Sequence, residues 1–261
     1  MWTSLRTAVT GLMGQQRALD VAADNMTKLQ TPGAKSQRVS FLELAPELQY
    51  LGVPDGEGNV QLEAREVGKG VRTPATLRNM SQGMLQATGD KMDIAVEGDG
   101  YLEVMAPGGQ IAYTHSGSLR VDGMGRVATT GGLVLSPTIT VPPGTSSLEV
   151  KPDGTVRGIG QDGVPQDVGK LKLVRFVNPE GLQLLSENLL MPTLASGAPI
   201  EAVAGDPGVG EIASGVIEAS NVDPREEYMR IVQAQRAYEL NVRALKTVDE
   251  MLQDANNLRR S

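Results

Sequence analysis

Both ends of this 261-residue chain repeat the same spacing of apolar residues, and this repeat limits the folds that are open to it. Apolar or small residues recur there at alternating intervals of three and four, the a/d pattern of helices that pack against other helices. The two seams are Leu5, Ala8, Leu12, Gln15, Leu19, Ala22, Met26 and Leu29, and Ile231, Ala234, Tyr238, Asn241, Leu245, Val248, Leu252 and Ala255. Each has one amide, Gln15 or Asn241, at a d position, where a buried polar group commonly fixes the register. Two such helices need partners.

The ends of these helices are predicted by local signals. The first begins within the first four residues and ends before Pro32, because proline disfavours a continued helix. The last begins at Pro224, with Asp223 as a cap and two glutamates in its positively polarised first turn. Further apolar residues beside both seams favour bundling of many copies. The alternative is a self-contained helical hairpin that only supports the rest of the chain.

The middle of the chain predicts β structure. From Val71 to about Leu194, short alternating runs are interrupted by turn signals such as Asp122-Gly123. Two tight antiparallel hairpins are expected, one pairing residues 93–97 with 101–105 and one pairing 148–150 with 155–157. Before this region, Gly33 to Val71 is expected to form an extended connector with a short helix around residues 40–48.

These predictions define an α+β chain. Long N- and C-terminal helices form a coiled-coil-like bundle, antiparallel if they pair within one molecule, and a mainly antiparallel β domain is inserted between them. The expected parts are a terminal helical domain (residues 1–32 plus 224–261), a connector (33–71 plus 211–223) and a β-rich outer domain (72–210).

Composition narrows the function. The net charge of -7, and the lack of any cluster of basic residues interleaved with aromatic ones, argue against nucleic acid as a partner. With 31 glycines, 15 prolines and 3% aromatic residues, a compact, aromatic-rich core is not expected. The chain has no cysteine, so no disulfide or thiolate metal site contributes to the fold. The first residues do not resemble a cleaved secretory signal.

Candidates for catalysis are few. His115 is the only histidine, and neither Ser116 nor Ser118 lies in the turn typical of a serine nucleophile. Two pairs of acids could serve glycoside hydrolysis, Asp90 with Asp93 and Glu97 with Asp99. Acids in turns are common, however, and the glycines lack the strand-to-helix frame of a phosphate loop. The expectation is a non-enzyme without catalytic residues, cofactor, metal or small-molecule substrate.

Motifs along most of the chain resemble those of bacterial flagellar rod and hook proteins. At the N-terminal end the resemblance rests on Thr10-Gly11-Leu12, Asp24-Asn25-Met26 and Thr31-Pro32-Gly33-Ala34-Lys35. In the centre it rests on Gly68-Lys69-Gly70-Val71, on Ser81-Gln82-Gly83 and on residues 93–101. At the C-terminal end it rests on Glu218-Ala219-Ser220-Asn221-Val222 and residues 233–241, while the length and the ending Asp249-Glu250-Met251-Leu252 are similar to those of distal-rod members. Asn25 and Asn221 could be hydrogen-bonding hubs at the helix ends, or plain caps.

The resemblance implies a structural axial protein that self-assembles into the rigid, hollow distal rod and transmits torque from motor to hook. The terminal helices would form the inner wall of the tube and the β domain the outer wall. Implied partners are other copies of the chain, proximal rod proteins, the hook protein, the surrounding P- and L-ring proteins and the flagellar type III export apparatus. The implied location is the basal body, in the rod that crosses the periplasm, after export without a cleaved signal. Proximal-rod or hook paralogues, or a wall-associated β-domain binding module or hydrolase, are the alternatives.

Overall fold

The computed structural model describes residues 2–54, 60–185 and 188–258. By its internal contacts the chain forms two compact units. The terminal unit contains residues 1–26, 37–77 and 224–261, and the β unit contains residues 27–36 and 78–223. Among the described residues, no helix combines the length and the apolar character needed to cross a membrane.

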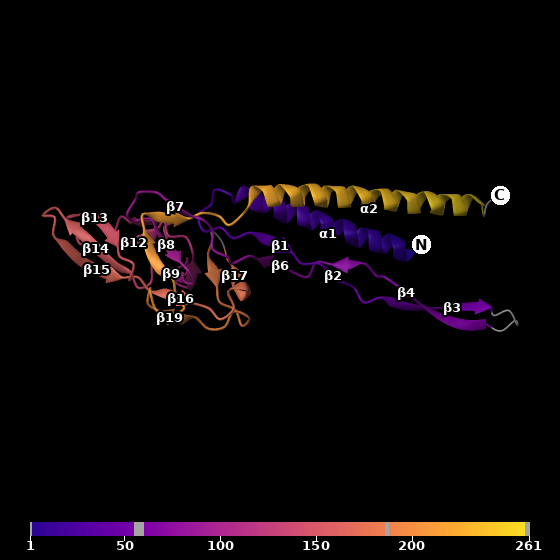
Figure 1. Ribbon diagram of the computed structural model, residues 1–261, viewed down its shortest axis with the longest axis horizontal. Helices are drawn as coiled ribbons and strands as arrows, with labels where there is room; N and C mark the ends of the chain where they lie inside the picture. Colours follow the sequence, from indigo (N-terminus) through magenta and orange to yellow (C-terminus); the bar gives the residue numbers. More distant parts are fainter. Residues whose placement is uncertain (1, 55–59, 186–187, 259–261) are drawn as a thin grey trace. The chain divides into compact units, whose positions relative to one another are not determined.

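Two helices dominate the terminal unit. Helix α1 spans Trp2–Thr27 and helix α2 spans Pro224–Leu258, and the two lie side by side in antiparallel directions (Figure 1). The predicted start of the last helix at Pro224 is confirmed, and α1 ends before Pro32 as expected. The fold is therefore α+β, as predicted.

The rest of the terminal unit is a run of paired strands. Its strands are β1 (Gln37–Val39), β2 (Leu42–Glu43), β3 (Glu47–Pro54), β4 (Val60–Val67), β5 (Val71–Arg72) and β6 (Thr76–Arg78). β1 pairs with β6, β2 with β5, and β3 with β4 in an eight-residue antiparallel hairpin. The predicted short helix at residues 40–48 is wrong, because β2 and the start of β3 occupy this stretch. Pro46 lies inside it and disfavours a continuous helix.

The β unit is a set of small antiparallel sheets. Its elements are β7 (Leu85–Ala87), β8 (Ile94–Glu97), β9 (Tyr101–Met105), β10 (Ile111–Thr114), β11 (Leu119–Val121), β12 (Val127–Thr129), β13 (Thr145–Val150), β14 (Thr155–Gly160), β15 (Pro165–Lys170), β16 (Leu173–Arg175), the short helix η1 (Pro179–Gly181), β17 (Gln183–Leu184), β18 (Leu190–Met191), β19 (Ile200–Ala202), β20 (Glu211–Ser214) and β21 (Val216–Glu218). The largest sheet has the order β17-β18-β10-β9-β16-β19, and β13-β14-β15 form a meander. The main hydrophobic core of the β unit contains buried side chains from several of these sheets, including Ile94, Leu102, Leu119, Leu173 and Ile212.

The two predicted hairpins had different outcomes. Residues 148–150 and 155–157 pair as expected, with Val150 opposite Val156. The turn at Asp122-Gly123 is also confirmed, because it joins the antiparallel strands β11 and β12. The hairpin of residues 93–97 with 101–105 is wrong, since β8 pairs with β20 and β9 lies between β10 and β16. β8 therefore pairs with a segment far along the chain instead of with the strand that follows it.

Candidate functional site

Two glycines let the neighbouring elements of the terminal unit approach α1 closely. A Cβ atom added at Gly11 would lie 3.2 Å from the Nδ2 atom of Asn241, so the seam amide of α2 faces a glycine of α1. A Cβ atom at Gly14 would lie 2.8 Å from the Phe41 ring, which is closer than real contacts allow. Glycine inside a helix costs about 1 kcal/mol relative to alanine. The close approaches give these two glycines a packing role that offsets this cost.

The helix pair covers only part of its own seams. Ala22 and Ala234 are buried, the other described seam residues are half-buried, and Tyr238 is exposed. Leu29 lies in a turn just beyond the end of α1, and the side chain of Ala255 is outside the described residues. Large apolar side chains beside the seams are exposed as well: Val9, Met13, Met229, Leu240 and Met251. Apolar surface of this extent commonly marks an interaction site.

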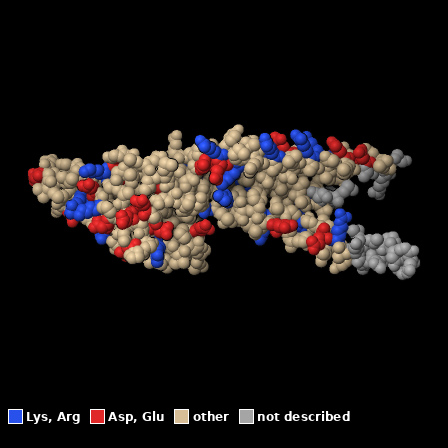
Figure 2. All heavy atoms as spheres, viewed as in Figure 1, with Lys and Arg blue, Asp and Glu red and all other residues tan. Residues whose placement is uncertain are grey.

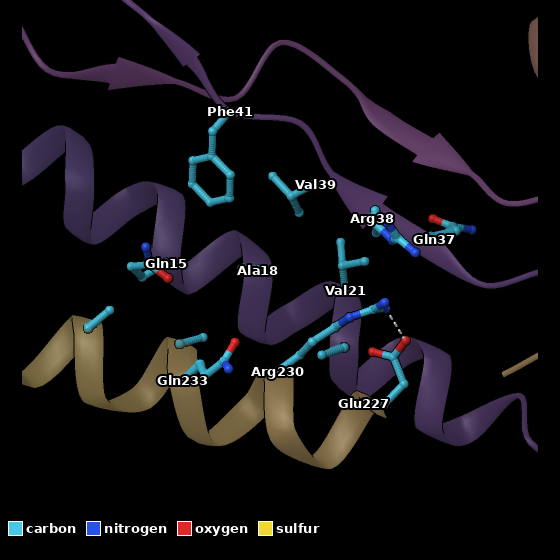
Figure 3. Close-up of a pocket in the computed structure, with 13 residues that line it drawn as sticks. Gln15, Ala18, Val21, Gln37, Arg38, Val39, Phe41, Glu227, Arg230 and Gln233 are labelled. Carbon is cyan, nitrogen blue, oxygen red and sulfur yellow. Dashed lines mark hydrogen bonds and ion pairs between the residues drawn. The ribbon is translucent and has the colours of Figure 1, made fainter. Parts of the chain in front are cut away.

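A pocket of about 330 Å³ opens between α1, α2 and the segment of β1 and Phe41 that follows α1 (Figure 3). Its apolar wall combines small helix residues with the side chains of Val39 and Phe41. Its polar wall contains Arg38, Arg230 and Glu227, and Figure 3 shows Arg230 bound to the Glu227 carboxylate. Glu227 is only 2% exposed, and its Oε2 atom has no hydrogen-bond partner in the described structure. We refer to this feature as the socket.

Asn25 fixes the exit from α1 within the same unit. Its side chain is fully buried, and it makes two hydrogen bonds to the backbone of Gln37. Nδ2 donates to the Gln37 carbonyl at 2.8 Å, and Oδ1 accepts from the Gln37 N–H at 2.9 Å. This amide therefore ties the last turn of α1 to the start of β1.

A second polar cluster, entirely within the β unit, ties together the segments that lead to and from the terminal unit. Lys35 Nζ donates to Glu218 Oε1 at 2.7 Å, and the side chains are 5% and 2% exposed. The same carboxylate oxygen accepts the Gly83 N–H at 2.7 Å, while the Glu218 carbonyl accepts the Gly33 N–H. We call this cluster, completed by Asn221, the clamp.

Asn221 extends the clamp. Its Oδ1 accepts the Ser36 N–H at 2.6 Å, and its Nδ2 donates to the carbonyls of Asn79 and Ser81 at 2.9 and 2.8 Å. Residues 33–36, 79–83 and 218–221 are thus joined by side-chain and backbone hydrogen bonds. A buried ion pair of this kind is costly to break, because the remaining charge loses its partner.

His115 packs beside the clamp as a neutral residue. Burial, with a smaller contribution from the Lys35 charge, lowers its pKa from 6.5 to about 3. Its ring packs on Tyr101 at a centroid distance of 4.2 Å, and its Nδ1 has no hydrogen-bond partner among the described atoms. A general base in catalysis needs a pKa near the working pH and must lie within hydrogen-bond reach of the proton that it removes. The low pKa of His115 does not meet the first condition, so this environment favours a packing role.

The acids considered for hydrolysis are placed differently from one another. Arg120 lies between Asp90 and Asp93, at 3.4 and 3.5 Å from their oxygens, and Asp93 is buried. Glu97 is at the end of β8, whereas Asp99 follows in the turn and its carbonyl accepts the Gly210 N–H.

Sequence reasoning missed the partners Lys35–Glu218 and Glu227–Arg230. Lys35 and Glu218 are 183 positions apart, so no local pattern joins them. The sequence shows only an isolated charge in each of two segments, Lys35 in the segment after α1 and Glu218 in the segment before α2. Glu227 and Arg230 are three positions apart on α2, a spacing that does predict contact.

The fold defines a class of protein in which a β-rich part is inserted between two terminal helices whose apolar faces remain partly uncovered. Two family profiles match this chain. The one described as "Flagellar hook protein FlgE/F/G D1 domain" matches residues 95–158, and the one described as "Flagellar basal body rod FlgEFG protein C-terminal" matches residues 213–258.

Full-length relatives agree with the profiles. The chain is 35% identical to the flagellar basal-body rod protein FlgG of Caulobacter vibrioides over 98% of this chain and 99% of the relative. It is 32% identical to FlgG of Bacillus subtilis over the whole of both chains, and 32% identical to FlgF of Salmonella typhimurium over 91% of this chain and 90% of the relative. The chain belongs to the flagellar basal-body rod family, a family of structural proteins of the flagellum.

Proposed function

We propose that this chain polymerises into the rigid, hollow distal rod of the flagellum, the drive shaft that transmits torque from the motor to the hook. The observation that carries the proposal is the partly uncovered helix pair, in which the described seam residues other than Ala22 and Ala234 keep exposed surface. Full-length similarity to FlgG proteins supports the distal position. A proximal-rod role is the second candidate, because the chain is also similar to a second kind of basal-body rod protein, FlgF.

In the proposed rod, terminal helices of many copies complete one another's seams in a coiled-coil-like bundle that forms the inner wall. Gln15 and Asn241 set the register of this bundle, because an amide at a seam position is satisfied only by a matching partner. The terminal helical domain is residues 1–32 plus 224–261, and the β-rich outer domain is residues 72–210. Residues 33–71 plus 211–223 act as the connector.

The connector would stiffen the tube by contact with neighbouring copies. Its hairpin of β3 and β4 exposes Leu48 and Tyr50, which lie two residues apart and so share one face of β3. Exposed aromatic and aliphatic side chains on one face are suited to contact a neighbour. The further partners proposed are proximal rod proteins, the hook protein, the P- and L-ring proteins and the type III export apparatus, which exports the chain without a cleaved signal to a rod that crosses the periplasm.

Electron microscopy of the concentrated, seeded protein tests this proposal, with a variant that lacks residues 230–261 as the comparison. Straight tubes from the full chain and none from the shortened chain are expected. Curved tubes would instead indicate a hook paralogue. Tubes that form without residues 230–261 would refute assembly through the terminal helices, and a wall-binding or hydrolytic activity that survives this deletion would favour the β-domain alternative.

A further inference from the structure

The two ends of the helix pair differ in a way that suggests how one copy meets the next. Helix α2 has 35 residues and α1 has 26, a difference that corresponds to about 13 Å of helix. Because Gly11 faces Asn241, the extra residues of α2 lie beyond the first residue of α1, and Figure 1 shows this overhang at the C-terminal end. The socket lies toward the opposite end of the pair, where α1 ends and α2 begins.

The overhang presents one apolar face with a single acid. Met251, Asp254 and Leu258 are spaced i, i+3 and i+7, so they lie on the same side of α2. The side chains of Met251 and Leu258 are 59% and 78% exposed, and acidic side chains are visible along this end of α2 (Figure 2). We call these three residues the overhang face.

The socket has the complementary character. Val39 and Phe41 contribute apolar surface, and Arg38 provides an exposed cation at its edge. Within residues 2–54, 60–185 and 188–258, neither Arg38 nor Asp254 forms an ion pair or a side-chain hydrogen bond. The socket thus offers an apolar wall beside an unpaired cation, and the overhang face offers apolar side chains around an unpaired acid.

We propose that the overhang face of one copy docks into the socket of a second copy, with Asp254 paired to Arg38. Two different surfaces of the same chain meet in this contact, so it is heterologous, and a heterologous contact that does not close into a ring generates an open helical filament. The contact therefore gives the polymer its direction. This inference rests on the proposed self-assembly and specifies which surfaces meet.

Charge reversal tests the pairing in the full chain. Arg38→Glu alone and Asp254→Arg alone place like charges opposite each other, and each is expected to reduce incorporation into the polymer by about tenfold or more. The double variant restores the opposite charges and should recover most of the incorporation. Arg157→Glu is the matched control, because Arg157 forms an exposed ion pair with Asp167 within the β unit and should not affect assembly.

Disulfide crosslinking tests the contact directly, since the chain has no cysteine of its own. Chains carrying Val39→Cys are mixed with chains carrying Met251→Cys, polymerised and oxidised, and linked dimers are expected only from the mixture. Val164→Cys replaces Met251→Cys in the control mixture, which should give none. Polymers that form normally but give no linked dimer, or single reversals that assemble like the wild type, would overturn the docking while leaving the proposed function intact. If the wild-type chain neither polymerises nor occurs in isolated flagellar basal bodies, the proposed function fails, and the docking fails with it.

Discussion

Removal of the Lys35 charge is the most informative perturbation of the β unit. Lys35→Met keeps an unbranched chain of similar reach but leaves the Glu218 carboxylate, 2% exposed, with the Gly83 N–H and without its cation. Loss of one partner from a buried ion pair costs about 3–5 kcal/mol, because the other charge stays buried without compensation. Total stabilities of about 5–15 kcal/mol are typical, so this cost is a large fraction of the whole.

The cost can be separated from that of an ordinary ion pair. Arg157 and Asp167 form a pair of equal length, 2.7 Å, but their side chains are 36% and 60% exposed. Arg157→Met should therefore change the free energy of unfolding by only about 0–1 kcal/mol. Denaturation in urea, followed by circular dichroism and by hydrogen exchange of β-unit amides, measures both variants.

A double variant identifies the cause. Lys35→Met together with Glu218→Gln removes both charges, and its cost should be smaller than the sum of the two single costs because no buried charge remains unpaired. The Gly83 and Gly33 amides should lose exchange protection first in Lys35→Met, since both bond to Glu218. Equal costs for Lys35→Met and Arg157→Met would refute the argument that the clamp depends on a buried charge pair.

Three further variants test other parts of the structure. Leu12→Asp places a charge in the half-buried seam and should block incorporation into the polymer without unfolding the β unit, whereas Gln16→Asp on the exposed side of α1 should assemble; sedimentation and circular dichroism measure the two outcomes. The folded pKa of His115 is lowered, so its contribution to stability is present above pH 6.5 and is lost as the pH falls toward about 3; His115→Phe should remove this contribution, and urea midpoints that keep the same pH dependence would contradict it. Gly83→Ala would place Cβ 2.0 Å from a backbone oxygen of the segment before α2 and should lower the melting temperature strongly, whereas Gly123→Ala, with nothing within 4 Å, should change it little.

Local signals predicted the helices and one of the two expected hairpins. The seam spacing and Pro224 act within a few residues, and the turn between Val150 and Thr155 closes directly, so both were visible in the sequence. Pairings of distant segments were not. Ile94 of β8 lies opposite Ser214 of β20, and the alternating pattern of either strand fits many partners equally well.

The turn after β8 shows why the expected hairpin did not form. Gly98 has φ +117°, and a Cβ atom there would lie 3.0 Å from Gly210, so the turn packs against the approach to β20. This contact directs β8 toward β20 and releases β9 to pair with β10 and β16. The clamp was missed for the same reason, because the sequence shows charges but not which of them become buried together.

A shaft that transmits torque needs stiffness both between copies and within each copy, and the chain uses different chemistry for the two. In the proposed rod, contacts between copies would form through the partly uncovered apolar faces, whose remaining surface would be buried on assembly. The contacts that hold the clamp together within a copy must instead persist in every state. The buried Lys35–Glu218 pair suits that need, because opening it would separate two buried charges at a high cost in free energy. Asn25 and Asn221 also hold segments together within a copy. Each side chain forms hydrogen bonds with backbone groups, whose positions do not change when a side chain changes its rotamer. Seam substitutions should therefore impair assembly and leave the monomer folded, whereas clamp substitutions should weaken the monomer first, so the order in which the two properties fail distinguishes the two sites.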